Sequence, residues 1–520
     1  MSKSTQFLTL ITKLKPNEKG YLKKYYLYKE GTFNKAMLNC LVEAETLLAK
    51  KVDIITIETA LKKKFGNNKA YSYSKIKGRL IETITNALLD YHSSGDAEYK
   101  VMQYLGKIKL LMERNDYELA KSFLQKAKKI ANENGLTYLA NRCELLTVQI
   151  AADNYVNGPE MDQLIDSLND SNRALFYGGE LQALNVRCWN LRQNIAAFKS
   201  SNSELGFNKA KVKLNKELLA LPIEQLLPIE HIKYYQVKRQ ILLMPDTQIE
   251  ECCTCSEEIL SIFNNHPSLK SSNVNKYVGS AILYLHDVIY SQQWSKYANA
   301  LAIAQKSLSD FKGKVSRGHN RYYNLIYLQL LYCRLKDDYQ SINEIAKNFN
   351  NSLKEHQPQP EWYWGINFSL AHCYFAIGKY SESLNYLLES KKVIHEPNFD
   401  IARTMSTRIL EIVLHYELKN FDVLPHLVRS FYRFLKSKNH LLSLEKELIY
   451  IFKALAKVNN DKAFKALLKS QLEKLKLLED DVENDPLLAS FDFIAYVNSI
   501  VTNRSYREVF AAKILQEQGH

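Results

Sequence analysis

The stretch that decides the fold is Leu370-Ala371-His372-Cys373-Tyr374-Phe375-Ala376-Ile377-Gly378-Lys379-Tyr380, followed by Ser381-Glu382-Ser383-Leu384. Apolar residues recur through its first part at the spacing of an α-helix. Gly378 is the residue type that most easily ends a helix in a tight turn. Tyr380 then opens a second amphipathic segment. The stretch therefore predicts two helices joined by a short turn, that is, a helical hairpin.

Weaker versions of this turn, each followed by an aromatic residue, recur along the chain. The aromatic residues are Tyr117, Trp294, Tyr339, Tyr380 and Phe421. The last four lie 45, 41 and 41 residues apart, and a fixed period of this size is typical of stacked helical hairpins. Residues three, seven and ten positions after each aromatic are small or apolar. We therefore expect that face of each second helix to pack against its neighbours.

Composition favours an all-α fold. The chain has 520 residues but only 17 Gly and 11 Pro, which are few breakers for a protein of many short strands. One compact core does not accommodate a chain of this length, whereas each unit of a solenoid packs only on its neighbours. We predict an all-α solenoid of antiparallel helix pairs, with a period of about 41 residues, preceded by an N-terminal helical segment.

The hairpins resemble the tetratricopeptide repeat. The resemblance is good over residues 364–396, fair over 101–131, and looser over 278–311, 323–352 and 405–437. The chain departs from the family in its spacing, which exceeds the usual length of about 34 residues. It also lacks the characteristic Trp of the first helix. The whole chain is similar to uncharacterised repeat proteins of the Bacteroidota phylum, which implies no particular function.

The resemblance implies a concave groove that is lined by residues of the first helices. Such a groove would bind a peptide or a partner helix. The positions that carry over are His286, Tyr290, Tyr327, Arg334, Phe368, His372, Phe375 and Tyr416. The alternative is a tighter superhelix, in which the protein's own side chains fill the groove.

The formal net charge of +14 is concentrated near the N-terminus, where residues 1–100 hold 18 Lys or Arg and 10 Asp or Glu. Two expected helices within residues 54–91 resemble a helix-turn-helix. Its second helix would enter a major groove while lysines neutralise phosphates. The candidate nucleic-acid contacts are Lys62, Lys63, Lys64, Lys69, Lys75, Lys77 and Arg79. The alternative is that these charges form the solvated face of ordinary helices.

Three regions are expected along the chain. A basic N-terminal helical segment covers residues 1–98, and the helical repeats cover 99–478. Residues 479–520 form an acidic linker and closing helices. We expect a closing helix that begins near Phe491 to cover the last apolar face of the solenoid.

Sequence motifs give no support for catalysis or for a metal site. The motifs typical of zinc proteases, serine hydrolases and phosphate-binding loops are absent. His286-Asp287 is a mere adjacency, because neighbours on a helix do not face each other. Cys252-Cys253-Thr254-Cys255 has one C-x-x-C spacing but no second pair, so we interpret these cysteines as structural.

The remaining features indicate a cytoplasmic protein. The eight cysteines look like reduced thiols, the apolar run near the N-terminus is too short for a signal peptide, and no stretch is long enough to span a membrane. We expect a non-enzymatic interaction or scaffold protein without a cofactor, which binds a protein or peptide. The alternative is a regulator that touches nucleic acid or ribonucleoprotein through the basic segment.

Overall fold

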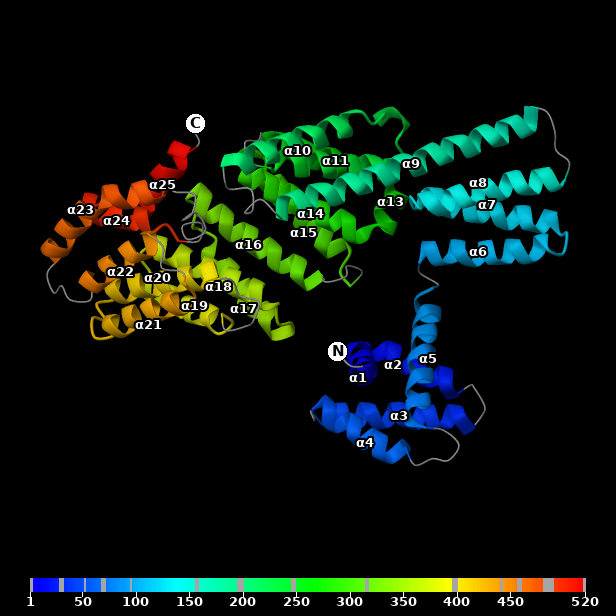
Figure 1. Cartoon of the computed structure of the whole chain (residues 1–520), viewed down its shortest axis with the longest axis horizontal. Coiled ribbons are helices and arrows are strands. Elements are labelled where there is room, and N and C mark those ends of the chain that lie inside the picture. Colours follow the sequence, from blue (N-terminus) through cyan, green and yellow to red (C-terminus); the bar gives the residue numbers. More distant parts are fainter. Residues whose placement is uncertain are drawn as a thin grey trace. The chain divides into compact units, whose positions relative to one another are not determined.

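The computed structural model is all-helical. It describes residues 3–27, 32–50, 53–66, 72–93, 96–154, 159–193, 201–244, 249–313, 318–394, 401–439, 443–455, 461–479 and 491–517. Within these ranges there are twenty-five α-helices, one short 3-10 helix and no strand (Figure 1). The predicted all-α class is therefore confirmed. None of the described helices is both long enough and apolar enough to cross a membrane.

The chain divides into two compact units, residues 1–175 and 176–520. The division lies within α9 (Pro159–Gln193), the longest of the described helices. The region boundaries near residues 98 and 478 stay predictions.

The first unit holds two groups of helices, each with its own hydrophobic cluster. The first group is α1 (Lys3–Lys13), α2 (Pro16–Leu27), α3 (Thr32–Ala49), α4 (Ile54–Gly66) and α5 (Tyr73–Ser93). These helices share a cluster in which Phe7, Ile57 and Leu80 are fully buried. The second group is α6 (Ala97–Met112), α7 (Tyr117–Glu133) and α8 (Thr137–Asp153), which lie side by side (Figure 1).

In the second unit, each helix packs mainly on helices one or two places away from it in the chain. After α9 come α10 (Ser201–Leu219), α11 (Pro228–Leu242), α12 (Ile249–Asn265), α13 (Pro267–Ser272), α14 (Val274–Tyr290), α15 (Trp294–Asp310), α16 (Gly318–Lys336), α17 (Ile342–Glu355), α18 (Pro360–Ala376), α19 (Tyr380–Lys391), α20 (Ile401–Glu417), α21 (Leu424–Ser437), α22 (Ser443–Leu455), α23 (Asp461–Glu479), α24 (Phe493–Thr502) and α25 (Tyr506–Glu517). Helices α11 and α16 each contribute to two hydrophobic clusters. The core is therefore continued from helix to helix along the chain.

The five turns that precede the predicted aromatic residues share one backbone geometry. Two positions before each aromatic, the chain adopts a φ between 55° and 74°, at Asn115, Gln292, Asp337, Gly378 and Lys419. The next residue then donates its backbone N–H to a carbonyl five residues earlier, as Lys379 does to Tyr374 at 2.9 Å. This Schellman hydrogen bond ends a helix. At four of the five turns a residue other than Gly is left-handed; Asn and Asp tolerate this conformation, whereas Gln292 and Lys419 adopt it at a cost of about 1 kcal/mol each.

The second helix that follows each of these turns buries the face that the spacing predicted. The face consists of Ala120, Leu124, Ala127, Tyr297, Leu301, Ala304, Ile342, Ala346, Phe349, Ser383, Leu387, Ser390, Leu424, Val428 and Phe431. All of these are buried except Tyr297 and Leu301, which are half-buried. The opening aromatics vary more, since Tyr339 is buried and Phe421 is exposed. The aromatic is therefore not needed at every turn to close the hairpin.

Candidate functional site

Helices α24 and α25 cover part of the predicted groove. Tyr506 of α25 lies against α18, where its Oη is 2.7 Å from Nε2 of His372. Phe375, one turn further along α18, packs against Phe491 and Tyr506 with ring centroids 5.3 and 5.1 Å away. The side chain of His372 is only 1% exposed as a result. This part of the groove is filled by the chain itself.

Further contacts hold these two helices on the neighbouring first helices. Nε of Arg507 in α25 donates to Oδ1 of Asp337, just beyond α16, at 2.7 Å. Oη of Tyr496 in α24 donates to Glu417 of α20 at 2.7 Å. Phe493 packs edge-on against a phenylalanine of α22, with ring centroids 5.2 Å apart. The two closing helices therefore contact α16, α18, α20 and α22.

For three of the predicted groove residues, the alternative in which the protein's own side chains fill the groove describes the structure. His372 and Phe375 are buried beneath the closing helices, and Phe368 is buried against Trp364, with stacked rings 4.9 Å apart. Helix α24 packs on α23, the helix that precedes it at the end of the series, and the closing helices also lie along α16, α18 and α20. Tyr416 is half-buried and packs against Phe464 at 5.3 Å.

The other four predicted groove residues remain accessible, and we call them the open face: His286, Tyr290, Tyr327 and Arg334. The His286 and Tyr290 rings of α14 stack at a centroid distance of 4.2 Å and an angle of 25°. Tyr290 is 45% exposed, and the side chain of His286 is 33% exposed. Tyr327 and Arg334, from α16, are half-buried.

Tyr290 of α14 interacts electrostatically with two residues of α16. Although solvent reaches Tyr290, desolvation by the surrounding atoms raises its pKa, and Tyr327 adds to the rise while Arg334 opposes it. The interaction of Tyr290 with Tyr327 and Arg334 shows that α14 and α16 contribute to one surface.

A buried ion pair between Arg239 and Asp287 holds the side chain of His286. Nε of Arg239 in α11 donates to Oδ2 of Asp287 at 2.6 Å, and a second guanidinium nitrogen donates to Oδ1. Ser256 of α12 also donates to this carboxylate. Nδ1 of His286 lies 3.1 Å from Oδ1 of Asp287, so the interpretation of these two neighbours as unpaired is wrong. The carboxylate accepts bonds from three helices and fixes the imidazole above it.

Burial would by itself raise the pKa of Asp287, but the hydrogen bonds from Arg239, His286 and Ser256 outweigh burial and lower it. The carboxylate is therefore ionised at neutral pH and balances the Arg239 guanidinium.

Two glycines on first helices allow a side chain of α16 to lie close above them. A Cβ on Gly279 of α14 would stand 2.7 Å from Nη1 of Arg321. A Cβ on Gly365 of α18 would stand 3.9 Å from the ring of Tyr327. That ring also meets Trp362 edge-on, with centroids 6.3 Å apart. Arg321 and Trp362 thus extend the open face, and neither was among the predicted groove residues.

The C-x-x-C cysteines lie inside the helical core. Cys252, Cys253 and Cys255 are buried in α12. Burial raises the pKa of Cys252 to about 12 and those of Cys253 and Cys255 to about 11. A helix N-terminus would have lowered these pKa values, so desolvation dominates here. Over the described ranges, no cluster of His, Cys, Asp and Glu has the arrangement of a metal site.

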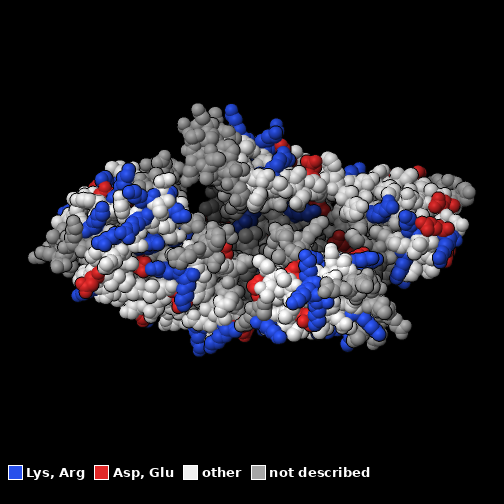
Figure 2. All heavy atoms as spheres, turned by 60° about the horizontal axis from the view of Figure 1, so that its bottom comes forward, with Lys and Arg blue, Asp and Glu red and all other residues white. Residues whose placement is uncertain are grey.

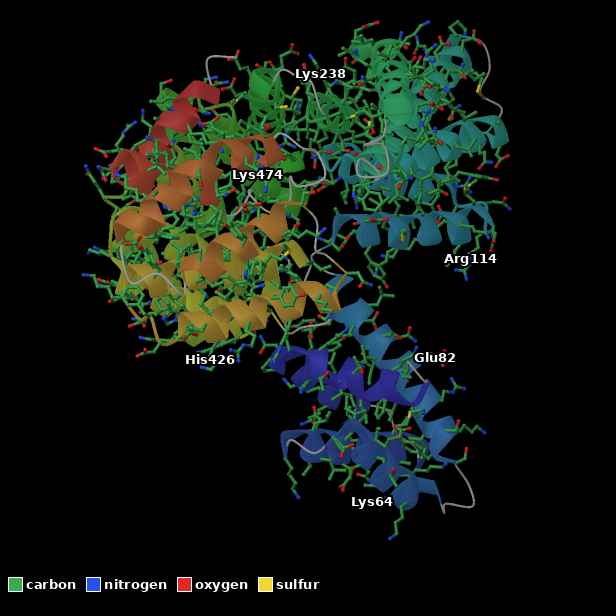
Figure 3. All side chains as sticks on the ribbon, turned by 60° about the vertical axis from the view of Figure 1, so that its left-hand side comes forward. Lys64, Glu82, Arg114, Lys238, His426 and Lys474 are labelled. Atoms are coloured by element: carbon green, nitrogen blue, oxygen red, sulfur yellow. The ribbon has the colours of Figure 1, made fainter. Side chains whose placement is uncertain are left out.

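The predicted helix pair near the N-terminus corresponds to α4 and α5. Lys69 lies outside the described residues. Three of the candidate nucleic-acid contacts are engaged in ion pairs, at distances of 2.7 Å for Lys64–Glu43, 3.1 Å for Lys77–Glu58 and 3.6 Å for Arg79–Glu82. Lys64 lies near the end of α4, and Glu82 lies on α5 (Figure 3).

The other three candidate contacts, Lys62, Lys63 and Lys75, are exposed and form no ion pair with any acid in the described ranges. The basic character of the sequence is visible on the surface, where Lys and Arg occupy more of the described face in Figure 2 than Asp and Glu do. The seven predicted contacts thus separate into an engaged set and an exposed set.

The fold and these surfaces define an all-α protein built from many short packed helices. No model of a known protein family matches the sequence, and no curated protein matches it in a sequence comparison.

Proposed function

We propose that the chain is a solenoid of antiparallel, tetratricopeptide-like helix pairs that acts in the cytoplasm as a non-enzymatic interaction or scaffold protein. Its ligand is a peptide or a partner helix, which binds on the open face. The observation that carries this proposal is that the face occupied by α24 and α25 continues into the open face. Helix α16 links the two parts, because it packs on α14 and also contacts α25.

The covered part of this face indicates how a ligand binds to the open part. There, Phe491 and Tyr506 pack their aromatic rings on Phe375 of α18, and Arg507 adds a charged hydrogen bond to Asp337. Aromatic residues and Arg are also the usual anchors of protein interfaces. Tyr290 and Tyr327 offer the same chemistry on rigid helices, so little ordering of the protein accompanies binding.

A displayed library of random peptides, selected against the full chain, tests the proposal. We expect enriched peptides to bind with a Kd in the range of about 1–100 μM. Fluorescence anisotropy of a labelled selected peptide would then be compared between the wild type and Tyr290→Ala or Tyr327→Ala, each of which should weaken binding at least about tenfold.

The matched control is Tyr432→Ala, which removes an exposed tyrosine from α21 in the same unit. This control should bind the peptide as the wild type does. If selection yields no binder, or if binders tolerate both open-face substitutions, the open face is not a peptide site.

A second proposal is that the first unit contacts nucleic acid through α4 and α5. The observation that favours it is the exposed set of lysines, Lys62, Lys63 and Lys75. Gly78, one turn after Lys75 on α5, is also exposed, and an added Cβ there would meet no atom within 4 Å, so a polynucleotide backbone can approach this part of the helix closely.

The test is a salt series of binding to labelled double-stranded DNA and to RNA. Replacing Lys62, Lys63 and Lys75 by Glu should abolish binding and its salt dependence. The charge-matched control replaces Lys209, Lys213 and Lys216 of α10, which are also exposed. Absence of any binding at low salt would exclude this second proposal.

A further inference from the structure

The helix that carries much of the open face is rich in cations. Residues 311–336, which include all of α16, hold six Lys or Arg and no Asp or Glu. On α14, Asp287 is already held by Arg239 and Ser256. Asp337, at the end of α16, is held by Arg507. The acids nearest to this surface in sequence are therefore engaged elsewhere.

Arg321 is the most informative of these cations. Its guanidinium lies above Gly279 and is half-buried, yet it forms no ion pair with any acid that the structure describes. Burial lowers the pKa of Arg321, and no described acid opposes the change. A partly desolvated cation without a counter-charge is unfavourable, and an anionic ligand group would relieve that cost.

A second cation lies one turn before Gly279 on α14. Lys276 is exposed to solvent, yet desolvation and the nearby Lys233 lower its pKa, while Glu230 opposes the change. The end of the open face near Arg321 therefore carries two cations.

The open face has the length of a short peptide. Arg321 and Arg334 are 13 positions apart on α16, which corresponds to about 20 Å along a helix. An extended peptide covers that distance with about six residues. Between the two arginines lie Tyr327 and the neighbouring rings of Tyr290 and Trp362.

We propose that the ligand of the open face is an acidic peptide segment that carries aromatic residues, with a carboxylate bound by Arg321. This inference rests on the proposed peptide-binding function and specifies the chemistry of the ligand. The planar guanidinium suits a carboxylate, to which it donates two parallel hydrogen bonds. The aromatic side chains of the peptide pack on Tyr290 and Tyr327.

The test uses three labelled peptides of about eight residues, in which Tyr alternates with Glu, with Gln or with Lys. Fluorescence anisotropy with the full chain should show that the Glu peptide binds at least about tenfold more tightly than the Gln peptide. The Lys peptide should bind more weakly still. Raising the salt concentration from about 50 to about 500 mM should weaken only the Glu peptide markedly.

Variants assign the effect to the site. Arg321→Ala should weaken binding of the Glu peptide about tenfold and leave the Gln peptide unchanged, and Arg321→Lys should restore part of the loss. The matched control is Arg114→Ala, because Arg114 is exposed just after α6 (Figure 3). Gly279→Ala should also weaken binding of the Glu peptide, since its Cβ would displace the Arg321 guanidinium. Gly365→Ala is the control for this variant, because its Cβ would make only ordinary contacts.

Each outcome decides the inference. Equal binding of the Glu and Gln peptides, or unchanged binding by Arg321→Ala, would overturn the acidic ligand. If library selection nevertheless yields neutral peptides that require Tyr290, the proposed function stands and only this inference fails. If neither the library nor the three peptides bind, both fail.

Discussion

The left-handed turn at Gly378 leads to a quantitative prediction. Its φ of 74° lies where an alanine is strained by about 1–2 kcal/mol. Alanine also restricts the unfolded chain, which returns about 0.4–1 kcal/mol. A Cβ at Gly378 would meet no atom within 4 Å, so no steric cost is added. We therefore expect Gly378→Ala to destabilise this hairpin by about 1 kcal/mol.

Gly106 provides a control of opposite sign. It lies in the interior of α6, and its added Cβ would likewise meet no atom within 4 Å. Alanine is favoured over glycine in a helix interior by about 0.5–1 kcal/mol, so Gly106→Ala should stabilise its helix. The two substitutions add the same atom into open space, and only the backbone conformation differs.

Hydrogen exchange followed by mass spectrometry measures both effects locally, without the assumption that the whole chain unfolds in one step. The segment around Lys379, whose N–H makes the Schellman bond, should exchange about five- to tenfold faster in Gly378→Ala. The segment around Gly106 should exchange more slowly in its variant. Unchanged exchange at Lys379, or a shift of the same sign in both variants, would refute the assignment of the cost to the left-handed turn.

Three further predictions follow from buried groups. Tyr506→Phe removes the hydrogen bond to His372 at 2.7 Å. We expect the free energy of unfolding, measured by chemical denaturation, to fall by about 1–3 kcal/mol. An unchanged denaturation midpoint would mean that this hydrogen bond adds no net stability. Asp287→Asn leaves Arg239 without its buried counter-charge and should cost about 3–5 kcal/mol at neutral pH. Because the folded state lowers the pKa of Asp287, its contribution is complete above the unfolded pKa of about 3.9 and is lost as the pH falls through the lower folded value; acid titration of the variant should lack this component. The eight cysteines are buried, and burial raises the pKa of Cys252 to about 12, so a thiol reagent at about pH 7.5 should label the native chain very slowly and the denatured chain fully, while fast native labelling would contradict this packing.

Local features of the fold could be predicted from the sequence because they depend on residues close together in the chain. The turn at Gly378, the beginning of α11 at Pro228 and the buried face with Leu124 all follow from short-range spacing. The sequence does not reveal that Gln292 and Lys419 adopt a positive φ, because neither is a Gly or an Asn. There the packing of the two helices outweighs the local preference.

The candidate site could be predicted only in part, because it depends on contacts between distant residues. The repeat frame located His286, Tyr290, Tyr327 and Arg334 on one accessible surface. It could not indicate that Tyr506 covers His372, since nothing in local spacing brings these residues together. The density of aromatic residues after residue 490 is a signal that could have suggested a buried role.

The return of α24 and α25 onto the earlier helices has a consequence for the order in which the protein folds during its synthesis. The partner of His372, Tyr506, is synthesised 134 residues later. The partner of Asp337, Arg507, is synthesised 170 residues later. Closing loops of this length is slow compared with forming local hairpins. Until residues 491–517 have emerged from the ribosome, Phe375 and its apolar neighbours stay exposed. The nascent chain therefore exposes an apolar, aggregation-prone surface of the kind that chaperones bind.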